Sequence, residues 1–100
     1  MSVTVSTSGN ITRINLSGEF DFSSQEALKQ AFEQATATPA KEIIIDLQQT
    51  IFIDSSVIRI FLKLSDLALK NKKSLALVNC SQRIREIFEI GGFDQIFKIN

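Results

Sequence analysis

The sequence contains no histidine and a single cysteine, Cys80. One cysteine cannot form an intramolecular disulfide, which fits a reducing compartment, and we expect Cys80 to be a structural or idle thiol. Without histidine or a second cysteine, the chain cannot build a zinc site or a histidine-based catalytic triad. A large share of enzyme chemistry is therefore excluded, and no cofactor or metal is expected.

Net charge and long apolar runs are lacking as well. Eleven basic and eleven acidic residues cancel, so nothing draws the chain in general to nucleic acid or to an anionic membrane. Apolar stretches such as Ile43–Ile45 and Ile51–Ile53 fall far short of the roughly 20 residues of a membrane span. The N-terminus has no basic region followed by an apolar block, so no signal peptide is expected. These absences predict a cytoplasmic protein with no direct nucleic-acid partner and no membrane insertion.

Two apolar patterns predict the strands of a single domain that takes in the whole chain. Residues 2–7 and 11–17 alternate apolar with polar side chains, which indicates an antiparallel hairpin of half-exposed strands. The runs Ile43–Ile45 and Leu75–Val78 are apolar at every residue, which is typical of inner, parallel strands covered on both faces. We expect nearly complete burial of both runs and a last strand at about 96–99.

Helices are predicted between these strands. One spans about 24–36, with Ser23 and Glu26 as a capping box. A long, strongly amphipathic helix begins near Asp54 and runs to about residue 70, and a short helix begins at Ser81. The order ββαβαβαβ predicts an α/β fold with a mixed, mostly parallel sheet and helices packed against it.

The segment Phe52-Ile53-Asp54-Ser55-Ser56 is the candidate functional site. It lies between a buried strand and the long helix, at the carboxyl side of the sheet, where ligands and regulatory sites collect in such folds. One interpretation is a helix cap, in which Asp54 or Ser55 accepts hydrogen bonds from first-turn N–H groups. The other is phosphorylation, because helix N-terminal amides stabilise a phosphate, which adds a charge of about −1.5 to −2. The two interpretations are compatible.

Charged residues along the long helix have two interpretations too. Ser56, Arg59 and Lys63 share a solvent-facing stripe, which is either an ordinary solvated face or a surface that touches a partner. The lysines within Lys70–Lys73 suit a helix C-terminus, where cations complement the helix dipole.

An enzyme-like alternative rests on three aspartates. Asp21, Asp46 and Asp54 would have to cluster at strand ends to bind Mg²⁺ through carboxylate oxygens. Aspartates at helix starts are more often caps.

Several segments together resemble a known family. Asp54-Ser55-Ser56 follows a buried Ile-Ile-Ile-Asp-Leu strand, Gly18-Glu19-Phe20-Asp21 matches a loop pattern, and Ser81–Phe93 matches a last helix with its exit turn. In this order the segments resemble the STAS domain of bacterial anti-sigma-factor antagonists, over nearly the whole chain. One position departs from the family's usual glycine: Val57 adds bulk to the first helical turn.

The resemblance implies a non-enzymatic, partner-switching regulator with Ser55 as the phosphoacceptor. Unphosphorylated, such an antagonist binds an anti-sigma factor that is a serine kinase of the ATPase type. Phosphorylation breaks the complex, and a metal-dependent serine phosphatase restores it. A constitutive STAS binding subunit of a transporter or a stressosome-like complex, with Ser55 as a helix cap only, is the alternative. The implied partner-binding residues are Asp21, Asp54, Ser55, Ser56, Arg59 and Lys63.

Overall fold

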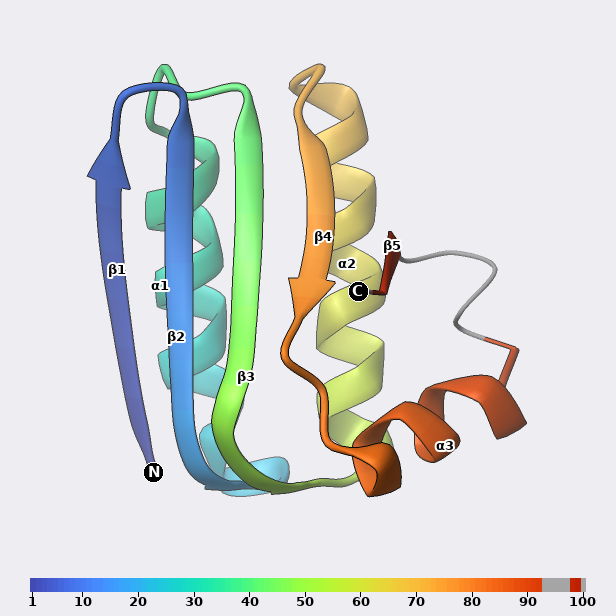
Figure 1. Ribbon diagram of the computed structural model, residues 1–100. Coiled ribbons are helices and arrows are strands. Elements are labelled where there is room, and N and C mark those ends of the chain that lie inside the picture. The colour runs from blue at the N-terminus through green and yellow to red at the C-terminus, as the bar shows by residue number, and fades with distance from the viewer. Residues whose placement is uncertain (93–97, 100) are drawn as a thin grey trace.

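The computed structural model describes residues 1–92 and 98–99 (Figure 1). Its elements are β1 (Ser2–Ser8), β2 (Ile11–Phe20), the 3₁₀ helix η1 (Phe22–Ser24), α1 (Gln25–Thr36), β3 (Glu42–Ile53), α2 (Ser55–Lys70), β4 (Ser74–Val78), α3 (Gln82–Ile90) and β5 (Lys98–Ile99). The order ββαβαβαβ is confirmed, with η1 as an addition. Residues 96 and 97 of the predicted last strand, and Phe93 of the predicted exit turn, lie outside the described residues.

The strands form one sheet in chain order, β1-β2-β3-β4-β5. β1 pairs antiparallel with β2, and every other neighbouring pair is parallel. Helices α1 and α2 pack against each other behind the sheet in Figure 1, and α3 lies beyond the end of β4. The predicted mixed, mostly parallel sheet with packed helices is therefore confirmed, and β3 is its central strand.

The predicted near-complete burial of the two apolar runs is wrong for Ile44, Ala76 and Val78, which alternate with core residues, and for Leu75, which is only partly buried against the core. Ile43 and Ile45 are buried, whereas Ile44 between them is partly exposed. In β4 only Leu77 is buried. Successive side chains of a strand point to opposite faces, and α1 and α2 both lie on one of those faces (Figure 1). The apolar runs thus predicted inner strands correctly but not which face is covered.

Strands β2 and β3 are longer than predicted. The segment expected to be a loop after residue 17 continues β2 to Phe20, and β3 continues through its glutamines to Ile53. The pairing of β2 with β3 shifts register twice along this extension. Thr50 lies there with its hydroxyl buried, donating to the Leu16 carbonyl over 2.8 Å. This bond satisfies a polar side chain inside the sheet.

The predicted capping box of Ser23 with Glu26 is wrong. Asp21 caps η1 instead, because its carboxylate accepts the Ser23 backbone N–H over 2.9 Å and the Ser23 hydroxyl over 2.6 Å. The Ser24 hydroxyl in return accepts the Asp21 N–H over 3.1 Å. A short 3₁₀ turn therefore precedes α1, and the box begins two residues earlier than the spacing suggested.

Three phenylalanines join the helices into one core. The Phe61 ring of α2 lies 5.8 Å from the Phe32 ring of α1 and 6.2 Å from the Phe88 ring of α3. Such ring pairs contribute on the order of 0.5–1.5 kcal/mol beyond the area that they bury. They hold α2 in place, and with it the start of α2 next to the sheet.

None of the described helices combines the length and apolar character needed to cross a membrane.

Candidate functional site

The site lies where β2 and β3 end and α2 begins. Phe20 and Ile53 are the last paired residues of the two strands. The backbone N–H of Asp54 donates to the Phe20 carbonyl over 3.2 Å, so the chain stays fastened to β2 as it leaves β3. Asp21 and Asp54 follow directly, and the structure therefore brings these two predicted site residues to neighbouring strand ends.

Asp54 is the cap of α2. Its Oδ1 accepts the backbone N–H groups of Ser56 and Val57 over 3.0 and 3.2 Å, and the Ser56 hydroxyl over 2.5 Å. Ser55 is the first residue of the helix and supplies no capping bond. The interpretation of Ser55 as a helix cap only is therefore wrong, since the preceding aspartate already has that role.

The two serines of the segment differ in availability. The Ser56 hydroxyl is bound to Asp54 and its residue is only partly exposed. Ser55 is exposed, and its hydroxyl has no hydrogen-bond partner among the described residues. Of the two, Ser55 has the exposed hydroxyl that no other described residue engages.

The first-turn amides are less available to a phosphate than expected. Those of Ser56 and Val57 are already bonded to the Asp54 carboxylate. A phosphate on Ser55 would meet that carboxylate beside it, and like charges repel. Two of the first-turn amides are therefore already occupied, and the backbone N–H of Ser55 is the first-turn donor left without a bond in the described part of the chain.

Val57 does not obstruct the outer surface. Its side chain is 0% exposed and belongs to the core. The bulk that distinguishes this position from the family's usual glycine is therefore directed inward, away from the face where Ser55 lies.

A hollow of about 510 Å³ adjoins Ser55. It brings together Ser55, Ser56, Arg59 and Lys63, four of the six predicted site residues, along one side of α2. Arg59 and Lys63 are exposed, as the helical stripe predicted. From the opposite side, η1 and the start of α1 contribute Phe22 and Gln25.

Exposed apolar side chains gather at the same end of the sheet. Phe22 is 74% exposed, Ile51 68% and Phe52 37%. Phe22 and Ile51 were not singled out in the sequence analysis, and Phe52 was included in the candidate segment without a role in partner binding, although each lies within four residues of Asp21 or Asp54. Their position beside a polar turn could have indicated a functional surface, because large apolar side chains exposed to solvent often mark an interaction surface.

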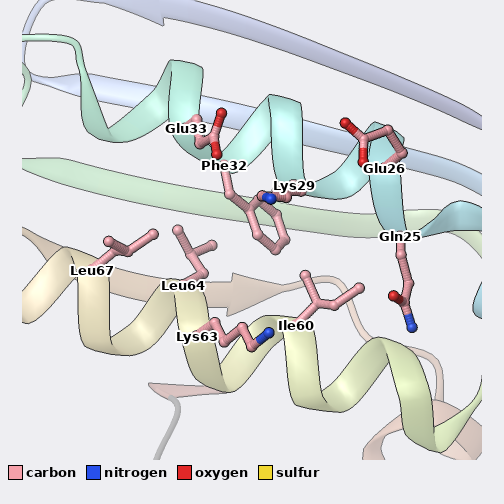
Figure 2. Close-up of a pocket in the computed structure, with 9 residues that line it drawn as sticks. All are labelled: Gln25, Glu26, Lys29, Phe32, Glu33, Ile60, Lys63, Leu64 and Leu67. Carbon is pink, nitrogen blue, oxygen red and sulfur yellow. The ribbon is translucent and has the colours of Figure 1, made fainter.

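A second groove runs between α1 and α2 (Figure 2). It measures about 300 Å³ and shares Gln25, Ile60 and Lys63 with the hollow at Ser55. Phe32 and Leu64 form an apolar floor, and charged side chains of both helices stand at its rim (Figure 2).

Asp21 is an exposed, ionised carboxylate. The hydrogen bonds from the Ser23 hydroxyl and the Ser23 backbone N–H hold the pKa of Asp21 below its ordinary value of 3.8. Its negative charge is therefore fixed at neutral pH, at the edge of the site.

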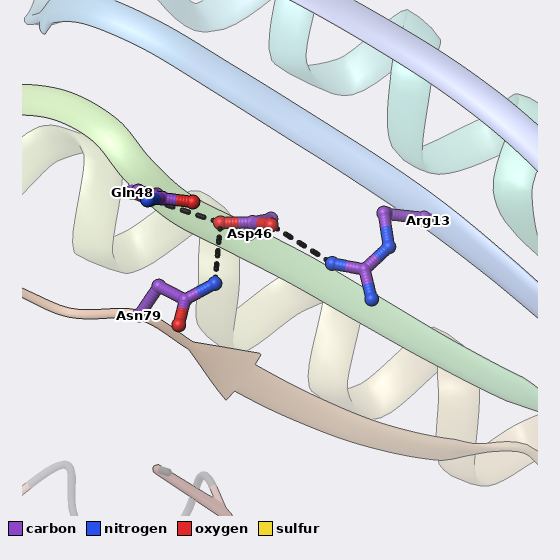
Figure 3. A network of polar contacts seen from close by, with 4 residues as sticks. All are labelled: Arg13, Asp46, Gln48 and Asn79. Carbon is purple, nitrogen blue, oxygen red and sulfur yellow. Dashed lines mark hydrogen bonds and ion pairs between the residues drawn. The ribbon is translucent and has the colours of Figure 1, made fainter.

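Asp46 lies within β3, whereas Asp21 and Asp54 follow the ends of β2 and β3. Its side chain is on the sheet face opposite the helices (Figure 3). Its Oδ2 pairs with the Arg13 guanidinium over 2.8 Å, and its Oδ1 accepts the Gln48 backbone N–H and the Asn79 side-chain amide. The clustering that a Mg²⁺ site of Asp21, Asp46 and Asp54 requires is not found. Within residues 1–92 and 98–99, no group of three acidic, cysteine or histidine side chains is placed to hold a metal.

Comparison with known proteins finds similar sequences that match nearly the whole chain. The family model described as the STAS domain matches residues 2–100. A STAS-domain containing protein of Pseudomonas aeruginosa is 34% identical over 95 residues, which cover 95% of this chain and 93% of the relative. An anti-sigma-B factor antagonist of Staphylococcus aureus is 21% identical over 100 residues, covering 100% and 93%.

Solved structures share the fold. An anti-sigma factor antagonist from Mycobacterium paratuberculosis superposes with a TM-score of 0.87 at 22% identity, covering 98% of this chain and 83% of that one. The Bacillus cell fate determinant SpoIIAA in its phosphorylated form gives a TM-score of 0.75 at 21% identity, covering 99% and 91%.

Proposed function

The chain belongs to the STAS domain family, and from this premise we propose that it is a cytoplasmic partner-switching regulator of the anti-sigma-factor antagonist type. Unphosphorylated, it binds an anti-sigma factor that is an ATP-dependent serine kinase. Phosphorylation of Ser55 releases the kinase, and a metal-dependent serine phosphatase restores binding. The protein itself is the regulator and the substrate of these enzymes.

One observation carries the proposal. The exposed hydroxyl of Ser55 has no hydrogen-bond partner in the described part of the chain, while Asp54 caps the helix and holds the hydroxyl of Ser56. A kinase must reach a free hydroxyl, and the local fold leaves Ser55 accessible without a structural task. The S. aureus relative and the solved antagonists support the choice of an anti-sigma factor as partner.

The surface around Ser55 supports docking. Ser56, Arg59 and Lys63 line the hollow beside it, and Asp21 and Asp54 stand at the neighbouring strand ends. The exposed apolar side chains of Phe22, Ile51 and Phe52 supply the kind of desolvated anchor that dominates protein interfaces.

Phosphorylation by the cognate kinase tests the proposal. With ATP, the wild type is expected to gain one phosphate, which peptide mass spectrometry places on Ser55. Ser55→Ala is expected to gain none, whereas the matched control Ser65→Ala keeps incorporation, because Ser65 belongs to the same helix but is not among the residues that line the hollow at Ser55. A phosphate found on Ser56, or on the 1% exposed Ser24, contradicts the site assignment.

A further inference from the structure

Two cations near Ser55 have no ion-pair partner within residues 1–92 and 98–99. Arg59 and Lys63 are exposed and line the hollow beside Ser55, and the ion pair found among the described residues joins Arg13 to Asp46 on the other face of the sheet. Arg59 and Lys63 stand four residues apart on one helix, where like charges repel slightly. Their placement is mildly unfavourable until an anion joins them.

The spacing along α2 places these cations on the same helix face as Ser55. Ser55, Arg59 and Lys63 are each four residues apart and therefore share one helix face. With a rise of about 1.5 Å per residue, Arg59 lies about 6 Å and Lys63 about 12 Å along the axis from Ser55. Long helical side chains generally lean back toward the N-terminus, which for Arg59 is the direction of Ser55, and both residues line the same hollow.

A phosphate at this position needs such a cation. The Ser56 and Val57 amides are bonded to the Asp54 carboxylate, which also places a negative charge next to the phosphate. A guanidinium matches phosphate oxygens with paired N–H donors, and charge-assisted bonds of this kind are about twice as strong as neutral ones.

We propose that the phosphate on Ser55 is held by the chain's own Arg59, with Lys63 as a weaker, longer-range contributor. Phosphorylation then does more than add negative charge: it takes the guanidinium of Arg59 away from the surface offered to the kinase. This mechanism rests on the proposed function in one respect, that Ser55 carries the phosphate.

The test uses full-length protein with phosphoserine installed at position 55 through an expanded genetic code, so no kinase is required. ³¹P NMR follows the second pKa of the phosphate at 0.1 M salt in the wild type, Arg59→Gln and Lys70→Gln. At this salt the screening length is about 10 Å, which Arg59 lies within. Lys70, at about 22 Å along the helix, lies beyond it and serves as a matched loss of one charge from α2.

Arg59→Gln is expected to raise the phosphate pKa by about 0.3 unit, as the strength of i,i+4 pairs on helices implies. Lys70→Gln is expected to leave it within about 0.1 unit, and 1 M salt should reduce the Arg59 effect, because the screening length falls to about 3 Å. Equal titration of all three proteins overturns the proposal. That failure is distinct from a failure of the proposed function, in which no kinase modifies Ser55 although the installed phosphate still contacts Arg59.

Discussion

Adjacent residues of the same type take different roles in this protein. Ser55 and Ser56 both stand at the start of α2, yet only the Ser56 hydroxyl is engaged by Asp54. The sequence alone left capping and phosphorylation open for Ser55, because a serine at a helix start suits both. The structure answers the question of capping alone: Asp54 accepts the first-turn donors, so Ser55 has no capping role, and its phosphorylation stays a prediction.

Cys80 is predicted to be a slow thiol. Its partial burial raises the pKa of the thiol above the ordinary value of 9.0, and the positive charge of Arg85 only partly opposes this. Because the reactive form is the thiolate, the folded protein should react with a maleimide more slowly than the urea-unfolded chain at pH 8. The folded-state rate should also rise at higher pH than the unfolded-state rate.

The raised pKa of Cys80 also makes the stability of the fold depend on pH. A thiol whose pKa is higher in the folded state favours folding below the unfolded pKa, and this contribution is lost as the pH rises through the folded pKa. A folded-state thiol that titrates at or below the pKa of the unfolded chain contradicts the burial argument.

Lys73 is predicted to stabilise the fold through two backbone acceptors. Its ammonium donates to the Thr38 carbonyl over 2.6 Å and to the Ala40 carbonyl over 2.5 Å, joining the end of α2 to the connection between α1 and β3. Lys73→Met removes both bonds and should lower the free energy of unfolding by about 1–3 kcal/mol.

Urea denaturation measures this effect, with Lys70→Met as the control, because Lys70 is exposed and lies in the last turn of α2. Equal midpoints for the two variants contradict the assigned role. The lysines of this segment were grouped in the sequence analysis at a helix C-terminus. The acceptors of Lys73 lie more than thirty residues earlier in the chain, so no local sequence pattern could predict these hydrogen bonds.

At the scale of elements, α2 is capped by Asp54, and the proposed phosphorylation site Ser55 is the residue after the cap. Asp54→Ala should lower the free energy of unfolding by about 1 kcal/mol, which is typical of a lost N-cap. Asp54→Asn should retain most of the stability, since asparagine also caps well. Ser55→Ala should stay within about 0.5 kcal/mol of the wild type, as surface substitutions usually do.

Chemical denaturation of these variants measures the free energy of unfolding and decides whether Asp54 or Ser55 caps α2. Asp66→Ala, an exposed position later in the same helix, is the control. If Ser55→Ala destabilises the protein as much as Asp54→Ala, Ser55 has the capping role after all. The assignment of Asp54 would then be wrong.

The order and type of the elements and most of their ends could be predicted, but the carboxyl ends of β2 and β3 could not. Alternation and apolar runs were enough for the hairpin and the inner strands, because burial of a sheet leaves a strong period-two or continuous pattern. The end of β3 escaped prediction because Gln48, Gln49 and Thr50 are polar, and Thr50 is satisfied only by the distant Leu16 carbonyl. The pairing that explains such residues is tertiary and cannot be read locally.

The candidate site was predicted in part. The helix start with Ser55 and the cationic stripe with Arg59 and Lys63 were found, because both depend on helical spacing, and the structure gathers them around one hollow. Asp46 was grouped with the wrong neighbours, since its partner Arg13 comes from an adjacent strand. Phe22 was not predicted as a site residue because its exposure depends on the 3₁₀ helix η1, which no sequence pattern predicted.

At the scale of the whole molecule, the core and the proposed switch are separable. Phe61 packs between Phe32 and Phe88 to hold α2 from the inside, while Ser55 and Arg59 lie on its outside. A phosphate can therefore change the charge of the surface without a rearrangement of the core. Because the chain has no net charge, a local addition of nearly two negative charges dominates this face.

Calorimetric titration of the cognate anti-sigma kinase with wild type, Ser55→Ala and Ser55→Asp tests the central claim most directly. Ser55→Ala should bind as tightly as the unphosphorylated wild type, because the alanine surface resembles the unmodified state. Ser55→Asp should bind more weakly by about 1–3 kcal/mol, where about 1.4 kcal/mol corresponds to a tenfold change. It carries one negative charge and is a partial mimic of a phosphate with nearly two. Equal affinity of all three proteins for the kinase contradicts the claim that the charge at Ser55 controls the complex.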